Sequence, residues 1–341
     1  MRLRAVVALT RVSSAPIAAA DWLRRRWLRL LGPLARPIVT RRELRVALGF
    51  SAMIVSALVA TLVAPLWMLI LGPLVWGVPH LVADLRYLVV RTGYHRRRLL
   101  WLVAGGPLLW VGLGGELWWG FLGAGATALL ARARLLPRLL ALTLLLACGA
   151  GLAWLGRVGD VIFAHAHNFI AVGLWWLWRP RSSRLHWVPL ALLVLVSVFL
   201  LGDVGLRLAE ASGGLEWFGG RMNLDYQLWR LSPGVAPELG LRLVLLFCFG
   251  QTIHYAIWLQ LLPDEDRGRA TPTSFRASHQ ALRQDLGDLG LGVAALLALG
   301  LAAWAVFDLL HASHGYFRVA RFHGHLELMA GALILLERRR G

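Results

Sequence analysis

A histidine and an aspartate stand one helical turn apart in an apolar stretch, residues 77–84, which reads Gly-Val-Pro-His-Leu-Val-Ala-Asp. At this four-residue spacing, His80 and Asp84 lie on one face of a helix and can serve one site. Pro79 lacks a backbone donor and can kink the helix just before the histidine. Ionisable side chains inside a membrane are costly and typically functional, so this pair is the first candidate for chemistry.

Further histidines follow in later apolar segments, namely His165, His167, His254, His323 and His325. Imidazole is a ligand for iron, copper and zinc, whereas magnesium and calcium prefer oxygen. Residues two positions apart point about 200° apart on a helix, so one member of each close pair is expected to face a shared site. With a rise of about 1.5 Å per residue, the histidines of four segments are expected in one layer, with His80, His167 and His325 at similar depth in the outer half of the membrane.

Two carboxylates and a phenol accompany these histidines. Asp84 and Glu327 each stand four residues after a histidine, His80 and His323 respectively. Either carboxylate can accept the second imidazole N–H and fix the tautomer, or it can bind the metal directly, and both roles remain open. Tyr255, next to His254, is a candidate donor of a proton or an electron. We therefore expect Asp84, Glu327 and Tyr255 to take part in the chemistry.

The composition indicates a membrane protein. Of the 341 residues, 58% are hydrophobic and 16% are charged, and the mean hydropathy is +0.63. The formal net charge is +18, but the arginines form short runs between apolar segments, which membrane topology explains without nucleic acid. Cys148 and Cys248 are the only cysteines, which excludes a disulfide framework, a thiolate zinc knuckle and covalent haem attachment.

About ten apolar segments have the length and flanking charges of membrane spans. The sequence therefore predicts an all-α, polytopic transmembrane helical bundle. Basic joints follow the even-numbered segments, which predicts that both termini are cytoplasmic, in a bacterial inner membrane. The fourth segment is short for a span. The predicted limits are 46–71, 73–90, 99–117, 119–131, 138–156, 161–178, 186–206, 240–262, 288–310 and 318–337.

Two parts are expected along the chain. We expect residues 1–45 to form a basic amphipathic segment at the cytoplasmic membrane surface. Residues 46–341 are expected to form a single transmembrane domain. Within that domain, residues 207–239 are expected to form an outer loop or lid, and residues 263–288 a cytoplasmic loop. The acidic run 264–266 in the second loop is expected to be a solvated turn.

The pattern Gly77-x-Pro79-His80-x-x-x-Asp84 resembles the G-x-P-H-x-x-x-D element of the Brp/Blh family of bacterial membrane β-carotene dioxygenases. The resemblance implies a polytopic helical protein that holds a non-haem iron with four histidines and cleaves a carotenoid with O2. It implies that His80 is an iron ligand and Asp84 its companion. His167, His254 and His325 would be the later histidines, each on a separate helix.

The leading hypothesis is a membrane oxygenase or oxidase with non-haem iron, or alternatively copper, that acts on an apolar isoprenoid or lipid with O2. The first alternative is an electron-transfer protein with haem b between two axial histidines. The second is a proton- or ion-coupled transporter that uses the same residues as a relay. A purely structural role is a further alternative. The expected partners are membrane lipids and a small apolar substrate, without nucleic acid, and no particular oligomeric state is predicted.

Overall fold

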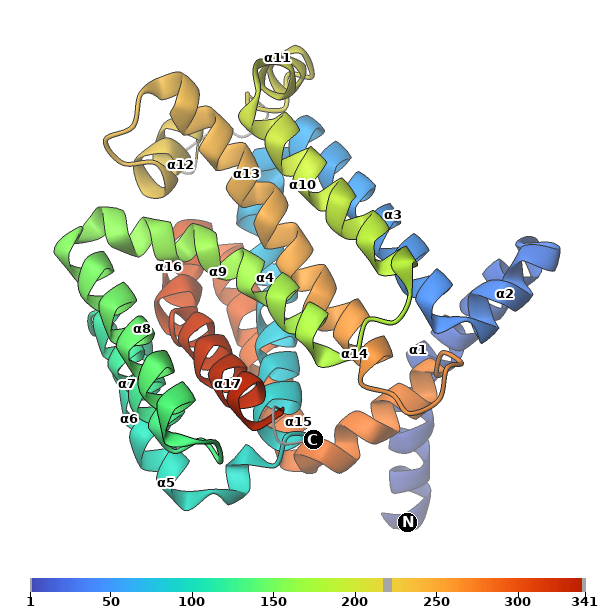
Figure 1. Ribbon diagram of the computed structural model, residues 1–341. Coiled ribbons are helices and arrows are strands. Elements are labelled where there is room, and N and C mark those ends of the chain that lie inside the picture. The colour runs from blue at the N-terminus through green and yellow to red at the C-terminus, as the bar shows by residue number, and fades with distance from the viewer. Residues whose placement is uncertain (1, 217–222, 339–341) are drawn as a thin grey trace.

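The computed structural model describes residues 2–216 and 223–338, with side chains for residues 15–216 and 223–337, and all regular structure in these residues is helical (Figure 1). This confirms the predicted all-α class. Eight described segments are long and apolar enough to cross a membrane, as expected of a multi-pass membrane protein. They are Arg42–Val63, Pro65–Val90, Leu135–Trp154, Arg157–Trp178, Arg184–Leu201, Pro237–Glu265, Phe275–Phe307 and Leu309–Glu337.

Shorter helices occupy the third and fourth predicted spans. The apolar segment Arg98–Gly112 is one of them, and α7, Trp118–Leu129, is the other. They pack against each other and α7 packs against α8, Leu135–Trp154. The structure therefore contains a helix at each predicted span, and eight of these have membrane length.

The first predicted joint is misplaced. We expected it at residues 71–73, but α3, Arg42–Val63, is followed by the single residue Ala64, and α4, Pro65–Asp84, continues through Pro73 and Pro79. A proline is well suited to the first position of a helix, because its missing N–H has no helical partner there. Pro65 rather than Pro73 thus starts the helix, which shifts His80 to about halfway along the segment Pro65–Val90.

The centre of the bundle consists of α4, α9 (Arg157–Trp178), α13 (Pro237–Ala256) and the pair α16 (Leu309–Ala320) and α17 (Phe322–Arg338). Helix α13 contacts α4 and α9, and α17 contacts α9 and α4 (Figure 1). Around this centre lie α3 and α10 (Trp187–Leu201) on one side, and α5 (Arg98–Leu100), α6 (Gly106–Gly112), α7 and α8 on the other (Figure 1). The long segment α15 (Phe275–Phe307), which has a kink at Gly287, is largely exposed at the periphery.

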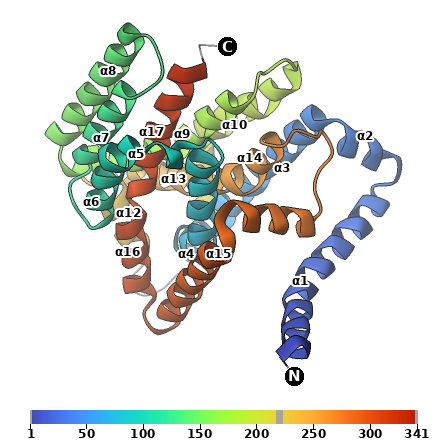
Figure 2. The same ribbon diagram turned by 90° about the horizontal axis from the view of Figure 1, so that it is seen from below.

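The N-terminal segment extends away from this bundle (Figures 1 and 2). It forms α1, Arg2–Leu30, and α2, Ala35–Thr40. Trp22 and Trp27 are exposed on α1. Asp21 accepts hydrogen bonds from the backbone N–H groups of Phe275 and Arg276, at 2.7 and 3.2 Å, and so holds α1 against the start of α15.

The predicted outer loop contains two short helices. They are α11, Asp203–Ala211, and α12, Leu224–Leu231, and α12 packs against α13. Residues 217–222, the middle of the predicted lid, lie outside the described residues. The other predicted loop, 263–288, is shorter than expected, since α14 takes Leu262–Glu265 and α15 begins at Phe275.

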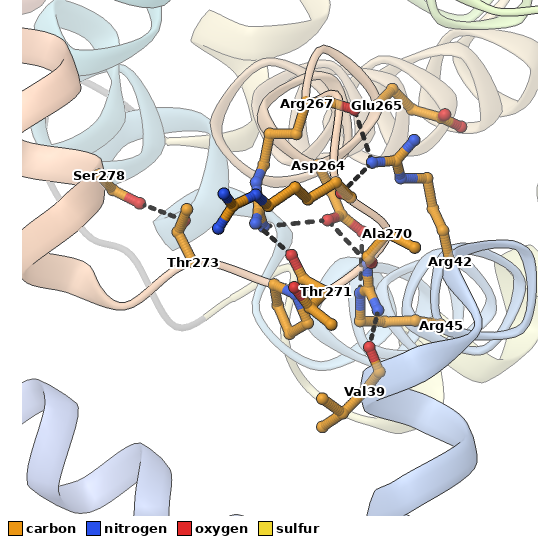
Figure 3. A network of polar contacts seen from close by, with 12 residues as sticks. Val39, Arg42, Arg45, Asp264, Glu265, Arg267, Ala270, Thr271, Thr273 and Ser278 are labelled. Carbon is orange, nitrogen blue, oxygen red and sulfur yellow. Dashed lines mark hydrogen bonds and ion pairs between the residues drawn. The ribbon is translucent and has the colours of Figure 1, made fainter.

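The prediction of a solvated acidic turn at residues 264–266 is wrong, because arginines from several helices converge on it. Arg45 donates two hydrogen bonds of 2.9 Å to the Asp264 carboxylate (Figure 3). Glu265 is 1% exposed and forms an ion pair with Arg181. Arg91 binds Asp266 at 2.8 Å.

Backbone contacts complete this network. Arg42 donates a hydrogen bond of 2.6 Å to the carbonyl of Arg267 (Figure 3). The short stretch that follows α14 is thereby bound to α3, and the acidic run closes one end of the bundle.

Candidate metal centre

Four histidines from four helices meet at the centre of the bundle. They are His80 on α4, His167 on α9, His254 on α13 and His323 on α17. Neighbouring rings form a closed circuit, with centroid distances of 4.9 Å for His80–His323, 5.0 Å for His323–His167, 5.2 Å for His167–His254 and 5.4 Å for His254–His80. The rings of His254 and His323 lie 5.5 Å apart across this circuit. We call these four residues the histidine ring.

Backbone carbonyls orient three members of the histidine ring. In each, Nδ1 contacts a backbone carbonyl one turn earlier: His80 contacts Trp76 at 3.3 Å, His167 contacts Ala164 at 2.7 Å, and His323 contacts Ala320. A carbonyl only accepts hydrogen bonds, so Nδ1 carries the proton and Nε2 keeps its lone pair. A ring held in this way is the usual form of a metal-binding histidine.

Two of these three Nε2 atoms are buried without a partner in the part of the chain that the structure describes. Among the described residues, Nε2 of His80 and Nε2 of His323 have no hydrogen-bond partner. His254 likewise has no hydrogen-bond partner for either ring nitrogen within the described chain. Buried polar atoms are normally satisfied, so these unpaired nitrogens are available to bind a cation at the histidine ring.

The two predicted carboxylates lie beside the ring. Ligand atoms of His80, His254 and His323 lie within 4.8 Å of one another, and so do those of Asp84, His323 and Glu327. Nε2 of His254 lies 3.5 Å from Oε1 of Glu327. That oxygen accepts a hydrogen bond of 2.7 Å from Nε1 of Trp258.

The sequence left two roles open for these carboxylates, which were to orient an imidazole or to bind the metal. The structure does not show the orienting role. Side chains on a helix lean toward its N-terminus, so Nδ1 of His80 and Nδ1 of His323 meet carbonyls of the preceding turn. Asp84 and Glu327 lie one turn later. Both oxygens of Asp84 and Oε2 of Glu327 are buried without a hydrogen-bond partner in the described part of the chain.

The structure brings one member of each close histidine pair into the ring. His165 points away, with Nε2 3.0 Å from the carbonyl of Leu231. His325 packs between Phe121 and Phe163, at centroid distances of 5.2 and 4.5 Å. His323 therefore takes the position that we expected for His325, because depth along a helix does not define which face of the helix meets its neighbours.

Tyr255 lies against the ring, with its centroid 4.7 Å from that of His80. Its hydroxyl is hydrogen-bonded to the hydroxyl of Tyr316 on α16. The Tyr316 ring covers Gly77 so closely that a Cβ atom there would lie 2.4 Å from the ring. Sequence reasoning missed Tyr316, and the only signal for it was the glycine one turn before His80.

The donor set suits a transition-metal ion that accepts nitrogen and carboxylate ligands, such as iron. A haem requires a flat slot between its axial histidines, and rings in mutual contact leave none. Comparison of the chain with models of protein families, with curated proteins and with solved structures finds no match.

Proposed function

We propose that the chain is a metal-dependent oxygenase of the bacterial inner membrane, with non-haem iron held by His80, His167, His254 and His323. Copper is the alternative metal. The observation that carries the proposal is the histidine ring, whose adjacent centroids lie 4.9–5.4 Å apart. A bound iron would supply open coordination positions for O2.

The protein itself contributes orientation and exclusion of water. The carbonyls bound to Nδ1 hold three imidazoles in the tautomer that leaves Nε2 free. Burial of His80, His254 and His323 keeps bulk water from the centre, which strengthens electrostatic interactions there. Tyr255 is the proposed proton donor, because its ring lies against His80 and its hydroxyl is paired with Tyr316.

An apolar isoprenoid or lipid is the proposed substrate. The helices around the centre expose large apolar side chains along their length, so such a molecule can approach from the bilayer. The resemblance of residues 77–84 to the Brp/Blh dioxygenases makes β-carotene the first compound to test. Both termini are proposed to be cytoplasmic, from the distribution of arginine along the chain.

Haem-dependent electron transfer is less favoured. Two axial imidazoles must lie on opposite sides of a porphyrin. The imidazoles of His80 and His323 instead lie against each other, with their ring centroids 4.9 Å apart. An absorption spectrum distinguishes the two, because bound haem gives a strong Soret band and non-haem iron does not.

The test is metal analysis of detergent-purified protein, together with its absorption spectrum. We expect bound iron without a Soret band in the natural chain, and loss of iron in His80→Ala and His167→Ala. His165→Ala is the matched control, since His165 lies on the same helix as His167 but bonds to Leu231, and it should retain iron. Metal-free natural protein, or normal iron content in His80→Ala, would refute the proposal.

A further inference from the structure

We propose that Asp84, Glu327 and His323 form a second cation site beside the histidine ring, so that the centre holds two divalent metal ions. The inference rests on the proposed function, because it takes the other three members of the histidine ring, His80, His167 and His254, as the first metal site. It adds a ligand role for both carboxylates.

The first argument is the state of the carboxylates. Asp84 and Glu327 are fully buried, at 0% exposure. Within the described residues, three of their four oxygens accept no hydrogen bond, and the fourth, Oε1 of Glu327, accepts one from Trp258. An ionised carboxylate that is buried without donors is strongly destabilising, and two adjacent ionised carboxylates repel each other. A divalent cation between them removes both penalties.

The arginine nearest in sequence does not supply this positive charge. Arg86 stands two residues after Asp84 on the same segment, but its Nε donates to Asp285 at 2.7 Å. Its Nη1 donates to the Tyr87 hydroxyl at 3.2 Å. The guanidinium is therefore directed to the charged end of the bundle and away from the carboxylate pair.

The second argument is the unpartnered imidazole that faces the carboxylates. His323 is 9% exposed, and its Nδ1 is bonded to Ala320, which leaves Nε2 with a lone pair. The ligand atoms of Asp84, His323 and Glu327 all lie within 4.8 Å of one another. Two oxygens and one nitrogen at this spacing form a set that Fe(II) or Mn(II) accepts.

The third argument concerns the number of ions. His323 has one free nitrogen, Nε2, because its Nδ1 is bonded to Ala320, so it can bind one ion only. When it joins Asp84 and Glu327, the first ion keeps His80, His167 and His254. Four imidazoles and two carboxylates around one ion would also fill an octahedral shell and leave no position for O2. Divided between two ions, the same donors leave open positions on each.

The experiment counts metal ions per chain. The full-length protein in detergent is stripped with a chelator, loaded anaerobically with Fe(II) or Mn(II), freed of excess ion and analysed for metal and protein. We expect two ions per natural chain and one in the isosteric double variant Asp84→Asn/Glu327→Gln. Asp160→Asn is the control, because this residue of α9 is half-exposed and lies 3.9 Å from Arg321; it should keep both ions.

A second measurement shows where the ions lie. Two Mn(II) ions in neighbouring triads should give a spin-coupled resonance spectrum, and the double variant should give the spectrum of an isolated ion. One ion in the natural chain, or a second ion that survives the double variant, would overturn this inference and leave the proposed function intact. Failure to bind any metal would instead overturn the proposed function.

Discussion

Replacing Gly77 with alanine tests the packing that holds Tyr255 and His80 in place. An added Cβ would lie 2.4, 2.5 and 2.8 Å from Cε2, Cζ and the hydroxyl oxygen of Tyr316. Carbon atoms in contact are normally about 3.5–4.0 Å apart, so the ring must retreat by about 1 Å. Tyr316 is hydrogen-bonded to Tyr255, and that ring contacts His80, so the displacement reaches the histidine ring.

The expected magnitude has two opposing parts. Overpacking of a buried site costs about 1–3 kcal/mol. Alanine is favoured over glycine within a helix by about 1 kcal/mol, which offsets part of that cost. Gly173→Ala in α9 is the matched control, because a Cβ there meets nothing within 4 Å. Both variants gain the same helix propensity. The difference between their free energies of unfolding, about 1–3 kcal/mol, is therefore the steric cost alone.

The assay is thermal unfolding of both variants in the same detergent. We expect Gly77→Ala to melt about 2–6 °C below Gly173→Ala, from the size of the chain and this free-energy difference. Adding Tyr316→Leu to Gly77→Ala should remove most of the difference, because the shorter side chain leaves room for the Cβ. Equal melting temperatures for the two alanine variants would show that Tyr316 does not cover Gly77.

Two further substitutions probe the buried charges. Glu265→Gln should destabilise the protein by about 3–5 kcal/mol, because it leaves Arg181 buried without its counter-charge. Thermal unfolding measures this loss. Asp288→Asn is the control, because Asp288 is exposed and its substitution should leave the melting temperature unchanged. Trp258→Phe should cost about 1.5–3 kcal/mol, because it removes the 2.7 Å hydrogen bond to Glu327. An unchanged melting temperature in the metal-free Trp258→Phe protein would contradict that hydrogen bond.

Much of the centre was predictable because ionisable residues in apolar segments are few. Their cost in a bilayer distinguishes His80, His254 and the two histidine pairs from the apolar residues around them in the sequence. Helical geometry also predicted that one member of each pair would leave the shared site, as His165 does. The carboxylates Asp84 and Glu327 were found by the same argument, and they do lie beside the ring.

Other features depended on contacts between distant segments. The acidic run 264–266 has the composition of an exposed turn, and it is buried only because arginines from distant parts of the chain, among them Arg45 and Arg181, converge on it. In the sequence, either Pro65 or Pro73 could mark the start of α4. The structure shows that the helix starts at Pro65. Tyr316 gave no signal of its own, since its role depends on a glycine far away in the sequence.

By itself, the sequence determined the helical class, the approximate helices and the set of histidines available to a site, because hydropathy and helical period are local properties. Only the tertiary structure decided that His323 rather than His325 joins the ring, and that backbone carbonyls rather than carboxylates orient three of its four imidazoles. The physical reason is that the rotation of a helix about its axis is set by side-chain packing against its neighbours. That packing places Asp84 and Glu327 together without donors, and the proposal of a second ion follows from it.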